Sequence, residues 1–399
     1  MESIAQTIVE GVDQVNTRNM LFSDVNLHVT RVVEVTTCHA VWRSGTVLVE
    51  SIPPGGQDMD VTLDAVAAAA GVSKSTASRA LSGSPRIRPE TKAAVQAAAA
   101  RLGYRPNRIA RGLRTQRSGL VGLVVTNLVN ASFHTITEVI QRRLDDLGYQ
   151  VLLCVTEGEA AREKRYLEAL LDHRVDGLII VGTGANGALL GRLWQAGTPI
   201  VNLLRAHSDS PGDTVTAADR AGALLACRHL LALGHRRIGY VGGPSTVHSG
   251  RERFAGYAEA LAGAGVPVAD ELVERGPYEV AFGAEAVGRL LTVEAAPTAI
   301  YLANHEAAFG ALPSLAQRGM HIPDAVSVIC HEDVPWFPYW HPPVSIVDNG
   351  ARDLGELAVD QLLRCIERDR PGEASPDGGR QLEVGARLVV RGSTAAPRN

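Results

Sequence analysis

From Ser118 onward the chain alternates short apolar runs with amphipathic helical segments, and this alternation restricts the fold more than any other feature. The apolar runs, which we expect to be β-strands, lie at 120–126, 150–155, 177–181, 199–203, 237–241, 299–303, 326–331 and 388–391. Helical patterns lie between them at 135–147, 162–173, 187–196, 218–233, 251–264, 282–291, 305–318 and 354–368. Strands that alternate with helices build parallel α/β sheets. Because about 280 residues exceed the comfortable size of one sheet, we predict two lobes.

A different pattern precedes this region, with three short helices expected within 61–103. The second helix is predicted at 74–81, after a glycine-containing turn, with Ser73 as its N-cap. The third is predicted over 89–102, with proline in its first turn and Gly103 just past its end. Two short helices joined by such a turn are typical of a helix-turn-helix, here with a third helix behind it.

The charge of the chain is unevenly distributed. Residues 59–117 hold eleven Lys and Arg against three Asp and Glu, whereas residues 1–58 hold three against seven. The remaining residues, 118–399, hold twenty-five against thirty-three, so the net charge of −4 conceals a compact basic segment. A basic segment ahead of an acidic domain indicates a nucleic-acid reader on a carrier domain. The alternative is a solvated basic face.

The second predicted helix has the side chains that a DNA-recognition helix needs. Such a helix presents short polar or basic groups to base edges and phosphates at its N-terminal end. Ser75 and Arg79 lie one turn apart on one face, and arginine is the most common reader of guanine. The predicted DNA-binding residues of this segment are Thr62, Ser73, Lys74, Ser75, Thr76, Ser78 and Arg79. The alternative interpretation is a solvated three-helix bundle that binds nothing.

The sequence VTLDAVAAAAGVSKSTASRALS (61–82), followed by YRPNRIARGL (104–113), closely resembles the N-terminal signature of LacI/GalR repressors. The resemblance covers nearly all of 59–395. It implies a repressor that binds a palindromic operator as a dimer and answers to a small effector. Two departures are Ala77 in place of the usual valine and Ser82 in place of the usual asparagine, which should alter packing and one backbone contact slightly.

The same resemblance implies a hinge helix or linker at 106–117. In the family, the hinge helices of two subunits pair in the minor groove, and a leucine wedges into the central base step. The matching DNA-binding residues are Asn107, Ala110, Arg111 and Leu113, with Leu113 as the wedge. Unstacking a base step costs a few kcal/mol, which is offset when the bent DNA contacts more protein. The alternative is that Leu113 is an ordinary linker residue.

The α/β region resembles type-I periplasmic sugar-binding proteins, whose two Rossmann-like lobes close on a small polar molecule. In such sheets ligands bind beyond the carboxyl ends of the strands. The resemblance places effector-binding residues at Asn130, Ser132, Phe133, Asp219, Arg253, Tyr278, Asn304 and Glu332. An arginine and carboxylates can hold hydroxyl groups while an aromatic ring stacks on the ligand. Three alternatives stay open: Asp219 as a helix cap, Asn304 as a partner of loop backbone, and Tyr278 as packing.

Two departures from the family pattern lie in this predicted effector site. Asn304-His305 stands where the family has Asn-Asp, and Cys330-His331-Glu332-Asp333 stands where it has Gly-aromatic-Asp-Asp. The longer carboxylate at Glu332 changes the pocket, so the effector need not be a standard hexose. A metal or acid–base role for the residues 331–333 is the weaker alternative, and we expect no metal and no cofactor.

Other function classes find little support in the sequence. No run of eighteen apolar residues suggests a membrane span, and the N-terminus does not resemble a secretory signal. The five cysteines are scattered, as in a reduced cytoplasmic protein. A transport solute-binding protein would need an export signal and no basic reader. The catalytic signatures of hydrolases and nucleotide-binding enzymes are lacking, and the glycine-rich stretch 181–187 has no suitably placed acidic partner, so we expect no enzyme.

These features predict a four-part chain in the cytoplasm. The expected parts are an extension at 1–58 that is disordered or non-native, a reader at 59–105, a hinge at 106–117 and an effector and dimerisation domain at 118–395. Within the last, lobe 1 is expected at about 118–218 plus 349–378, and lobe 2 at about 219–348 plus 379–395. The expected partners are an operator duplex, a sugar, polyol or nucleoside effector, and a second copy of the chain. No leucine heptad follows Arg391, which favours a dimer, with a tetramer as the alternative.

Overall fold

The computed structural model describes residues 61–81, 84, 86–104, 117–205, 207, 209–367 and 379–398, and the backbone of 33–35, 38–43 and 46–51. The chain divides into two compact units, Met1–Pro106 and Asn107–Asn399. None of the helices in the described residues is long and apolar enough to cross a membrane.

The expected N-terminal extension contains a small antiparallel sheet. Its strands, in the order β1-β2-β3, are β1 (Val33–Val35), β2 (Cys38–Arg43) and β3 (Thr46–Ser51). The pairing joins neighbours in the sequence, as in a meander.

Removing residues 1–58 is expected to leave the remaining chain folded and able to bind DNA. The described residues of the hydrophobic core of the reader all lie within 61–104, and we therefore expect its packing not to depend on the extension. We expect the free energy of unfolding of the reader to change by less than about 0.5 kcal/mol. Urea unfolding and DNA binding of the full chain and of residues 59–399 would measure this. A truncated chain that fails to fold or to bind DNA would show that the extension is part of the functional protein.

The predicted helix-turn-helix is confirmed. Its helices are α2 (Leu63–Ala69), α3 (Lys74–Leu81) and α4 (Pro89–Leu102). Ser73 caps α3, because its hydroxyl accepts a hydrogen bond from the Thr76 backbone amide at 3.2 Å. α4 ends at Gly103, whose φ of 69° favours glycine. The side chains packed between the three helices are Val66, Ala67, Ala77, Ala80, Val95, Ala98 and Ala99.

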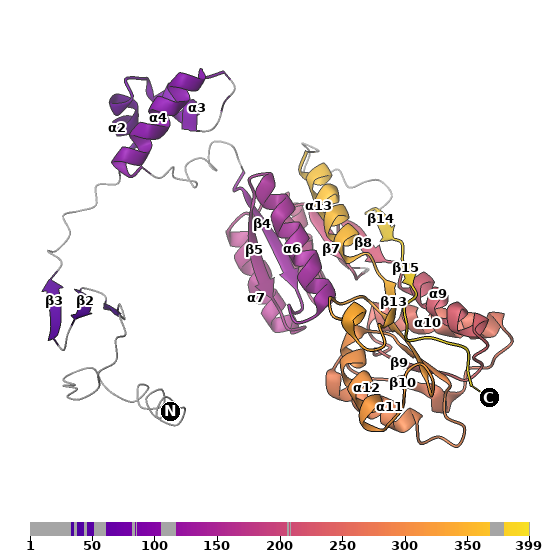
Figure 1. The fold of residues 1–399 in the computed structure, drawn as a ribbon. Helices are drawn as coiled ribbons and strands as arrows, with labels where there is room; N and C mark the ends of the chain where they lie inside the picture. Colours follow the sequence, from indigo (N-terminus) through magenta and orange to yellow (C-terminus); the bar gives the residue numbers. More distant parts are fainter. Residues whose placement is uncertain are drawn as a thin grey trace. The chain divides into compact units, whose positions relative to one another are not determined.

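Lobe 1 is a three-layer α/β sandwich with an all-parallel sheet. Along the sheet, the strands are β14 (Gln381–Val384), β8 (Asp213–Ala217), β7 (Ile200–Leu203), β6 (Gly177–Ile180), β4 (Leu120–Val125) and β5 (Gln150–Val155). Helices α6 (Ala131–Asp146) and α13 (Ala351–Glu367) pack together on one face (Figure 1). Helices α7 (Ala160–Asp172) and α8 (Gly187–Gln195) cover the other face.

Lobe 2 repeats this architecture. Along its sheet, the strands are β10 (Val273–Arg275), β9 (Ile238–Gly242), β11 (Ala299–Leu302), β12 (Ser327–His331), β13 (Ser345–Asp348) and β15 (Arg387–Val389), with only β15 antiparallel to its neighbour. Helices α11 (Val280–Leu290) and α12 (His305–Gln317) cover one face. Helices α9 (Asp219–Ala232) and α10 (His248–Gly263) cover the other. Short 3-10 helices η1 (Asp270–Leu272) and η2 (Phe337–Tyr339) complete the lobe.

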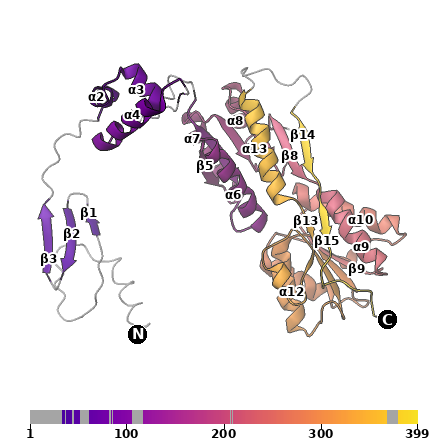
Figure 2. The same ribbon diagram turned by 45° about the horizontal axis from the view of Figure 1, so that its top comes forward.

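Three segments of the described chain pass between the lobes. They follow β8, β13 and β14. The third crossing differs from the expectation, which assigned all of 379–395 to lobe 2. Instead, β14 pairs with β8 in lobe 1 and the chain crosses only before β15, because Gln381–Val384 completes the open edge of the lobe 1 sheet. Figure 2 shows β14 beside β8, although the two strands lie far apart in the sequence.

Candidate functional site

The recognition helix α3 exposes its predicted DNA-binding side chains. Ser73, Lys74, Ser75 and Arg79 are exposed, and Thr76 and Ser78 are half-buried. Ala77 and Ala80 point instead into the reader core. The helix therefore presents a polar and basic face on a fixed support, as a DNA-reading helix requires.

The basic groups of this face, Lys74 and Arg79, contact neighbouring residues of the reader. Lys74 Nζ lies 2.7 Å from Asp64 Oδ2, but both side chains are more than 60 % exposed. An exposed ion pair contributes about 0–1 kcal/mol, so Lys74 can exchange Asp64 for a phosphate. Arg79 donates from Nε to the Ser75 carbonyl at 3.2 Å and from Nη2 to the Ser75 hydroxyl at 3.3 Å. These bonds direct its guanidinium along α3 toward the N-terminal end of the helix.

The predicted hinge contacts fall outside the described residues. These are Asn107, Ala110, Arg111 and Leu113, and the departure at Ser82 also falls outside. Thr62, the remaining predicted DNA contact, is exposed and caps α2 by accepting from the Ala65 amide at 3.3 Å.

A second polar cluster joins the two lobes of the α/β domain, and we call it the inter-lobe site. Its residues are Asn130, Asp219, Arg253, Asn304, His305, Glu306 and Glu332. Most of them follow the carboxyl ends of parallel strands: β4, β8, β11 and β12. This edge is where open α/β sheets bind their ligands.

Arg253, on α10, is the centre of the inter-lobe site. Its side chain is 6 % exposed and donates from Nε to Asp219 Oδ1 at 2.7 Å and from Nη2 to Glu332 Oε1 at 2.8 Å. Nη1 donates to the Ala303 carbonyl at 2.6 Å. Among the contacts of the described residues, these bonds account for three of the five N–H groups of a guanidinium. Burial acts to lower the pKa of Arg253, but the two carboxylates outweigh burial and raise its pKa well above the ordinary value.

Glu332 is held in an unusual backbone conformation. Its φ of 77° lies in the left-handed region, which costs a non-glycine residue about 1–3 kcal/mol and is often found at functional sites. Burial alone would raise the pKa of Glu332, but Arg253 and the hydrogen bond with His305 hold its pKa well below the ordinary range. The carboxylate is therefore ionised, and it accepts from Arg253 and His305 at the same time.

The structure connects most of the predicted effector residues to this cluster. Asn130 Nδ2 and Asn304 Nδ2 both donate to the Glu306 carboxylate, at 2.6 and 2.8 Å. Ser132 and Phe133 lie in the first turn of α6, which Asn130 caps by accepting from the Phe133 amide at 3.1 Å. Their role in effector binding stays a prediction.

Tyr278, from the loop between β10 and α11, lies close enough to the inter-lobe site for the charges of Arg253 and Glu332 to act on it. Its hydroxyl lies 2.8 Å from Ser249 Oγ, on α10. A side chain at Gly243 would come within 2.2 Å of the Tyr278 ring, so the close approach of this ring requires glycine. Burial raises the pKa of Tyr278, which keeps its hydroxyl protonated and available as a donor.

The structure bears on two of the three alternatives left open by the sequence, those for Asp219 and Asn304. The Asp219 side chain does not cap α9, since it accepts from Arg253 instead. Asn304 precedes α12 without a side-chain capping bond and donates to Glu306.

Residues 331–333 do not converge on one point. Arg253 pairs with Glu332, whereas Arg391 pairs with Asp333 at 2.6 Å. His331 is fully buried, and its Nδ1 lies 2.7 Å from the Tyr301 hydroxyl. Burial and Arg253 hold the pKa of His331 well below the ordinary value, so the ring is neutral.

Three functional candidates were missed from the sequence. His305 and Glu306, at the start of α12, complete the inter-lobe site. His305 stood out as a departure from the family pattern, whereas Glu306 gave no signal. Arg205, just after β7, donates to the Gly182 carbonyl at 3.2 Å, and burial lowers its pKa. Its charge interacts with Tyr278 of lobe 2, which places a cation on the lobe 1 side.

The side chains of His305, Glu306 and Glu332 could in principle hold a metal ion, since their ligand atoms lie within 4.8 Å of one another. Two observations disfavour an ion. The Ala131 amide points its hydrogen at His305 Nε2, and Arg253 already neutralises Glu332. A cation among these donors would be repelled by both, so the cluster fits a hydrogen-bond network better.

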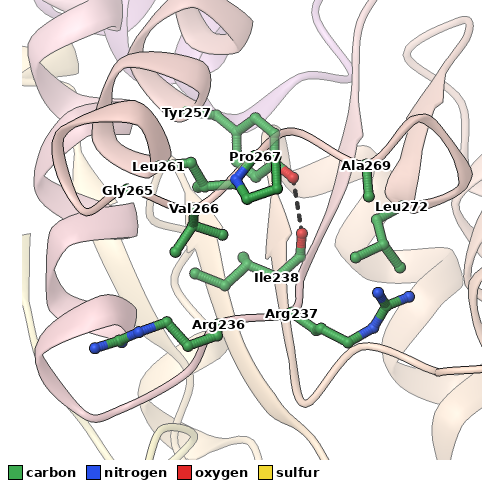
Figure 3. A pocket seen from close by; sticks show the side chains of 10 residues that line it. All are labelled: Arg236, Arg237, Ile238, Tyr257, Leu261, Gly265, Val266, Pro267, Ala269 and Leu272. Atoms are coloured by element: carbon green, nitrogen blue, oxygen red, sulfur yellow. Dashed lines mark hydrogen bonds between the residues drawn. The ribbon is translucent and has the colours of Figure 1, made fainter.

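A separate hollow of about 270 Å³ lies at the opposite edge of the lobe 2 sheet, near the start of β9 (Figure 3). Its lining includes Ile238, Pro267 and Leu272. Arg236 and Arg237 border it, but both donate to backbone carbonyls nearby. With its arginines already engaged and little other polarity, this hollow is a poor match for a polar effector.

Two family profiles match the chain. Residues 62–107 match "Bacterial regulatory proteins, lacI family", and residues 227–394 match "Periplasmic binding protein-like domain". The first match spans the helix-turn-helix, and the second spans most of lobe 2, with Arg253 and Glu332.

Individual proteins match over nearly their whole length. The HTH-type transcriptional repressor PurR of Photorhabdus laumondii is 32 % identical over 335 residues, which cover 83 % of this chain and 96 % of that protein. PurR of Photobacterium profundum is 29 % identical, covering 83 % and 98 %. Among solved structures, the lac repressor dimer bound to operator and the anti-inducer ONPF has a TM-score of 0.72 and 29 % identity, covering 84 % and 99 %. The regulator CelR in complex with cellobiose has a TM-score of 0.62 and 27 % identity, covering 83 % and 99 %.

Proposed function

The chain belongs to the LacI family of transcriptional repressors, and on this basis we propose that it represses transcription as a homodimer on a palindromic operator, under the control of a small polar effector. The effector binds at the inter-lobe site. We further propose that the protein acts in the cytoplasm, without enzymatic activity and without a cofactor.

The DNA-reading part of this proposal is supported by the exposed face of α3. Lys74 and the hydroxyl groups near it are suited to phosphates, and Arg79 to a guanine edge. In the hinge, Asn107, Ala110 and Arg111 are proposed to follow the minor groove, with Leu113 as the wedge. This assignment rests on the family resemblance.

The effector part is carried by one observation: Arg253 is buried between Asp219 and Glu332 at the ligand edge of lobe 2. Asn130, Ser132 and Phe133 supply the lobe 1 side, and Tyr278 and Asn304 supply the rest of the lobe 2 side. A charged pair among amides and an aromatic ring suits a ligand rich in hydroxyl groups. The cellobiose bound by CelR supports a sugar-like effector.

The proposed function is tested by two measurements on the full chain. DNA selected from a random pool should contain a palindrome, and its affinity should fall linearly with the logarithm of salt concentration. Sugars, polyols and nucleosides should be screened by thermal shift, and a hit should change affinity for the selected duplex. Selection of no common sequence would overturn the regulator. Selection without any hit that changes DNA affinity would overturn only the control by these effectors.

A further inference from the structure

The N-terminus of α12, in lobe 2, reaches directly onto the N-terminus of α6, in lobe 1. The Ala131 backbone amide donates to His305 Nε2 at 3.2 Å. The Asn130 side-chain amide donates to Glu306 Oε1 at 2.6 Å. Two neighbouring residues of lobe 2 therefore accept two hydrogen bonds from neighbouring residues of lobe 1.

This geometry defines the protonation state of His305. Its Nδ1 lies 2.5 Å from Glu332 Oε2. Because an ionised carboxylate can only accept, Nδ1 carries the hydrogen. Nε2 accepts from Ala131 and therefore carries none. This hydrogen-bond pattern is that of the neutral ring, which His305 adopts above its pKa, with its donor facing lobe 2 and its acceptor facing lobe 1.

We propose that neutral His305 is the positioning residue of the inter-lobe site, because it holds lobe 1 by accepting a hydrogen bond from the Ala131 amide. A proton added at Nε2 breaks this hydrogen bond, so that lobe 1 is released and Nε2 pairs with the Glu306 carboxylate instead. The proton comes from solvent and forms the Nε2–H bond, and no other covalent bond of the protein forms or breaks. Glu306 is the second member of this latch, which we define as His305, Glu306, Asn130 and Ala131.

Protonation reverses the contacts on the lobe 1 side. An Nε2–H would face the Ala131 N–H, so that two donors oppose each other. The imidazolium would also meet the positive end of the α6 dipole. Glu306 Oε1, 3.6 Å from Nε2, is the nearby acceptor for the new hydrogen. When Glu306 pairs with His305 it leaves Asn130, so both bonds to lobe 1 are exchanged for one ion pair inside lobe 2.

The charged groups around His305 act on its pKa in opposite directions. Glu332, after β12, and Glu306, on α12 itself, favour the proton, whereas Arg253, on α10, opposes it. Asp219, on α9, is engaged by Arg253, and Phe309 contributes only its ring. On α6, His134 follows Ala131 within the first turn and is exposed.

The pKa of His305 follows from this balance. Burial lowers it, but the hydrogen bond and charge of Glu332 and the charge of Glu306 outweigh burial and raise the pKa above the ordinary value for histidine. The proton prefers the released state, in which no Ala131 amide opposes it. Closure therefore expels a proton and is favoured as pH rises through this pKa. By linkage, the closed population falls by at most about tenfold for each pH unit below it.

A consequence for effector binding rests on the proposed function, whereas the latch itself does not. An effector that binds between closed lobes should bind more tightly at higher pH, by the same limit of about tenfold per pH unit.

The latch is tested in the full chain, without effector or DNA and with EDTA present to exclude metal. Nitrogen-15 labelling of the twelve histidines allows each ring tautomer to be observed by NMR, and the His305 signals are those absent from H305Q. Hydrogen exchange of the segment 127–134 reports on Ala131 and its neighbours. H305Q keeps an acceptor for Ala131 and a donor for Glu332 but cannot take up the proton. H134Q, an exposed change on α6, is the matched control.

In the wild type and H134Q, we expect a neutral His305 with hydrogen on Nδ1 at high pH, and loss of protection in 127–134 as the ring titrates. In H305Q, protection should be retained and should not follow that titration. In E306Q, the pKa of His305 should fall, because one of the charges that raises it is removed.

The proposal is overturned by hydrogen on Nε2 of neutral His305, or by protection that is equally independent of pH in wild type and H305Q. Should H305Q not fold, the tautomer and exchange of wild type and E306Q still decide. Success or failure here leaves the selection of DNA by the reader as a separate result.

Discussion

Replacing Arg253 by alanine is expected to abolish the effector response and to lower the free energy of unfolding of the α/β domain by about 3–5 kcal/mol. The cause is the burial of Asp219 and Glu332, which would lose their shared cation while remaining out of water. Urea unfolding measures the loss of stability, and titration with the ligand found by thermal shift measures the loss of response. The reader has its own hydrophobic core, so non-specific DNA binding should persist.

Two control variants separate recognition from stability. R220A removes an arginine of similar chemistry whose pair with Glu259 is exposed, and it should cost less than about 1 kcal/mol. A triple variant, R253M with D219N and E332Q, removes all three charges together. It should recover much of the stability of R253A but none of the response, because a buried ion network can be replaced by neutral groups more easily than it can be broken. Effector affinity in R253A within about threefold of the wild type, less than 1 kcal/mol, would exclude Arg253 from the site.

Arg79→Ala is expected to weaken binding to the selected duplex by about 1–3 kcal/mol and to relax base preference at one position in each half-site. Arg79 is the exposed arginine of α3, directed toward the N-terminal end of the recognition helix by Ser75. Gel mobility on selected and scrambled duplexes at two salt concentrations measures affinity, and repeated selection measures base preference. Arg101, in the last turn of α4, is the charge-matched control. R101A should affect both duplexes alike and leave base preference unchanged.

The same assay tests the hinge. Leu113→Ala should reduce DNA bending and weaken binding to the palindrome, with a much smaller effect on non-specific DNA. The reason is that an inserted leucine unstacks a base step and bends the duplex, and only the bent duplex makes the additional contacts with the protein. Equal losses on both duplexes with no change in bend would make Leu113 a linker residue. For Arg79, equal losses on both duplexes with no change in base preference would make it a phosphate contact.

The reader could be predicted from local signals alone. Ser73 marks a helix start by the hydrogen bond that its hydroxyl accepts, and α3 begins directly after it. Gly103 marks a helix end by its left-handed backbone, and α4 ends directly before it. Four strands of the α/β domain were missed, because each contains polar residues and none is a continuous apolar run: β8, β10, β13 and β14. They become strands through their neighbours in the sheet.

The candidate site shows the same division. Arg253, Asp219 and Glu332 were proposed from a family pattern, and the structure places them in direct contact. Glu306 could not be found in this way, since its meaning depends on Asn130, which lies 176 residues away along the chain. Residues 331–333 are adjacent in sequence, yet their partners differ. Adjacency in the sequence does not imply that side chains share a target here, because β12 ends at His331 and the φ of 77° at Glu332 turns the chain out of the extended conformation.

The three crossings between the lobes can act as a hinge between the two sheets of the α/β domain. Three chain segments that join two rigid sheets permit rotation about the line through them but resist sliding, which would stretch at least one segment. Two of the crossings leave lobe 1 at the carboxyl ends of β8 and β14. β4 begins at the other edge of the same parallel sheet, where Asp176 accepts from the Ser118 and Gly119 amides at 2.8 Å each. Displacement in a rotation grows with distance from its axis, so we expect a rotation of the lobes about these crossings to be felt at Ser118, which directly follows the predicted hinge at 106–117.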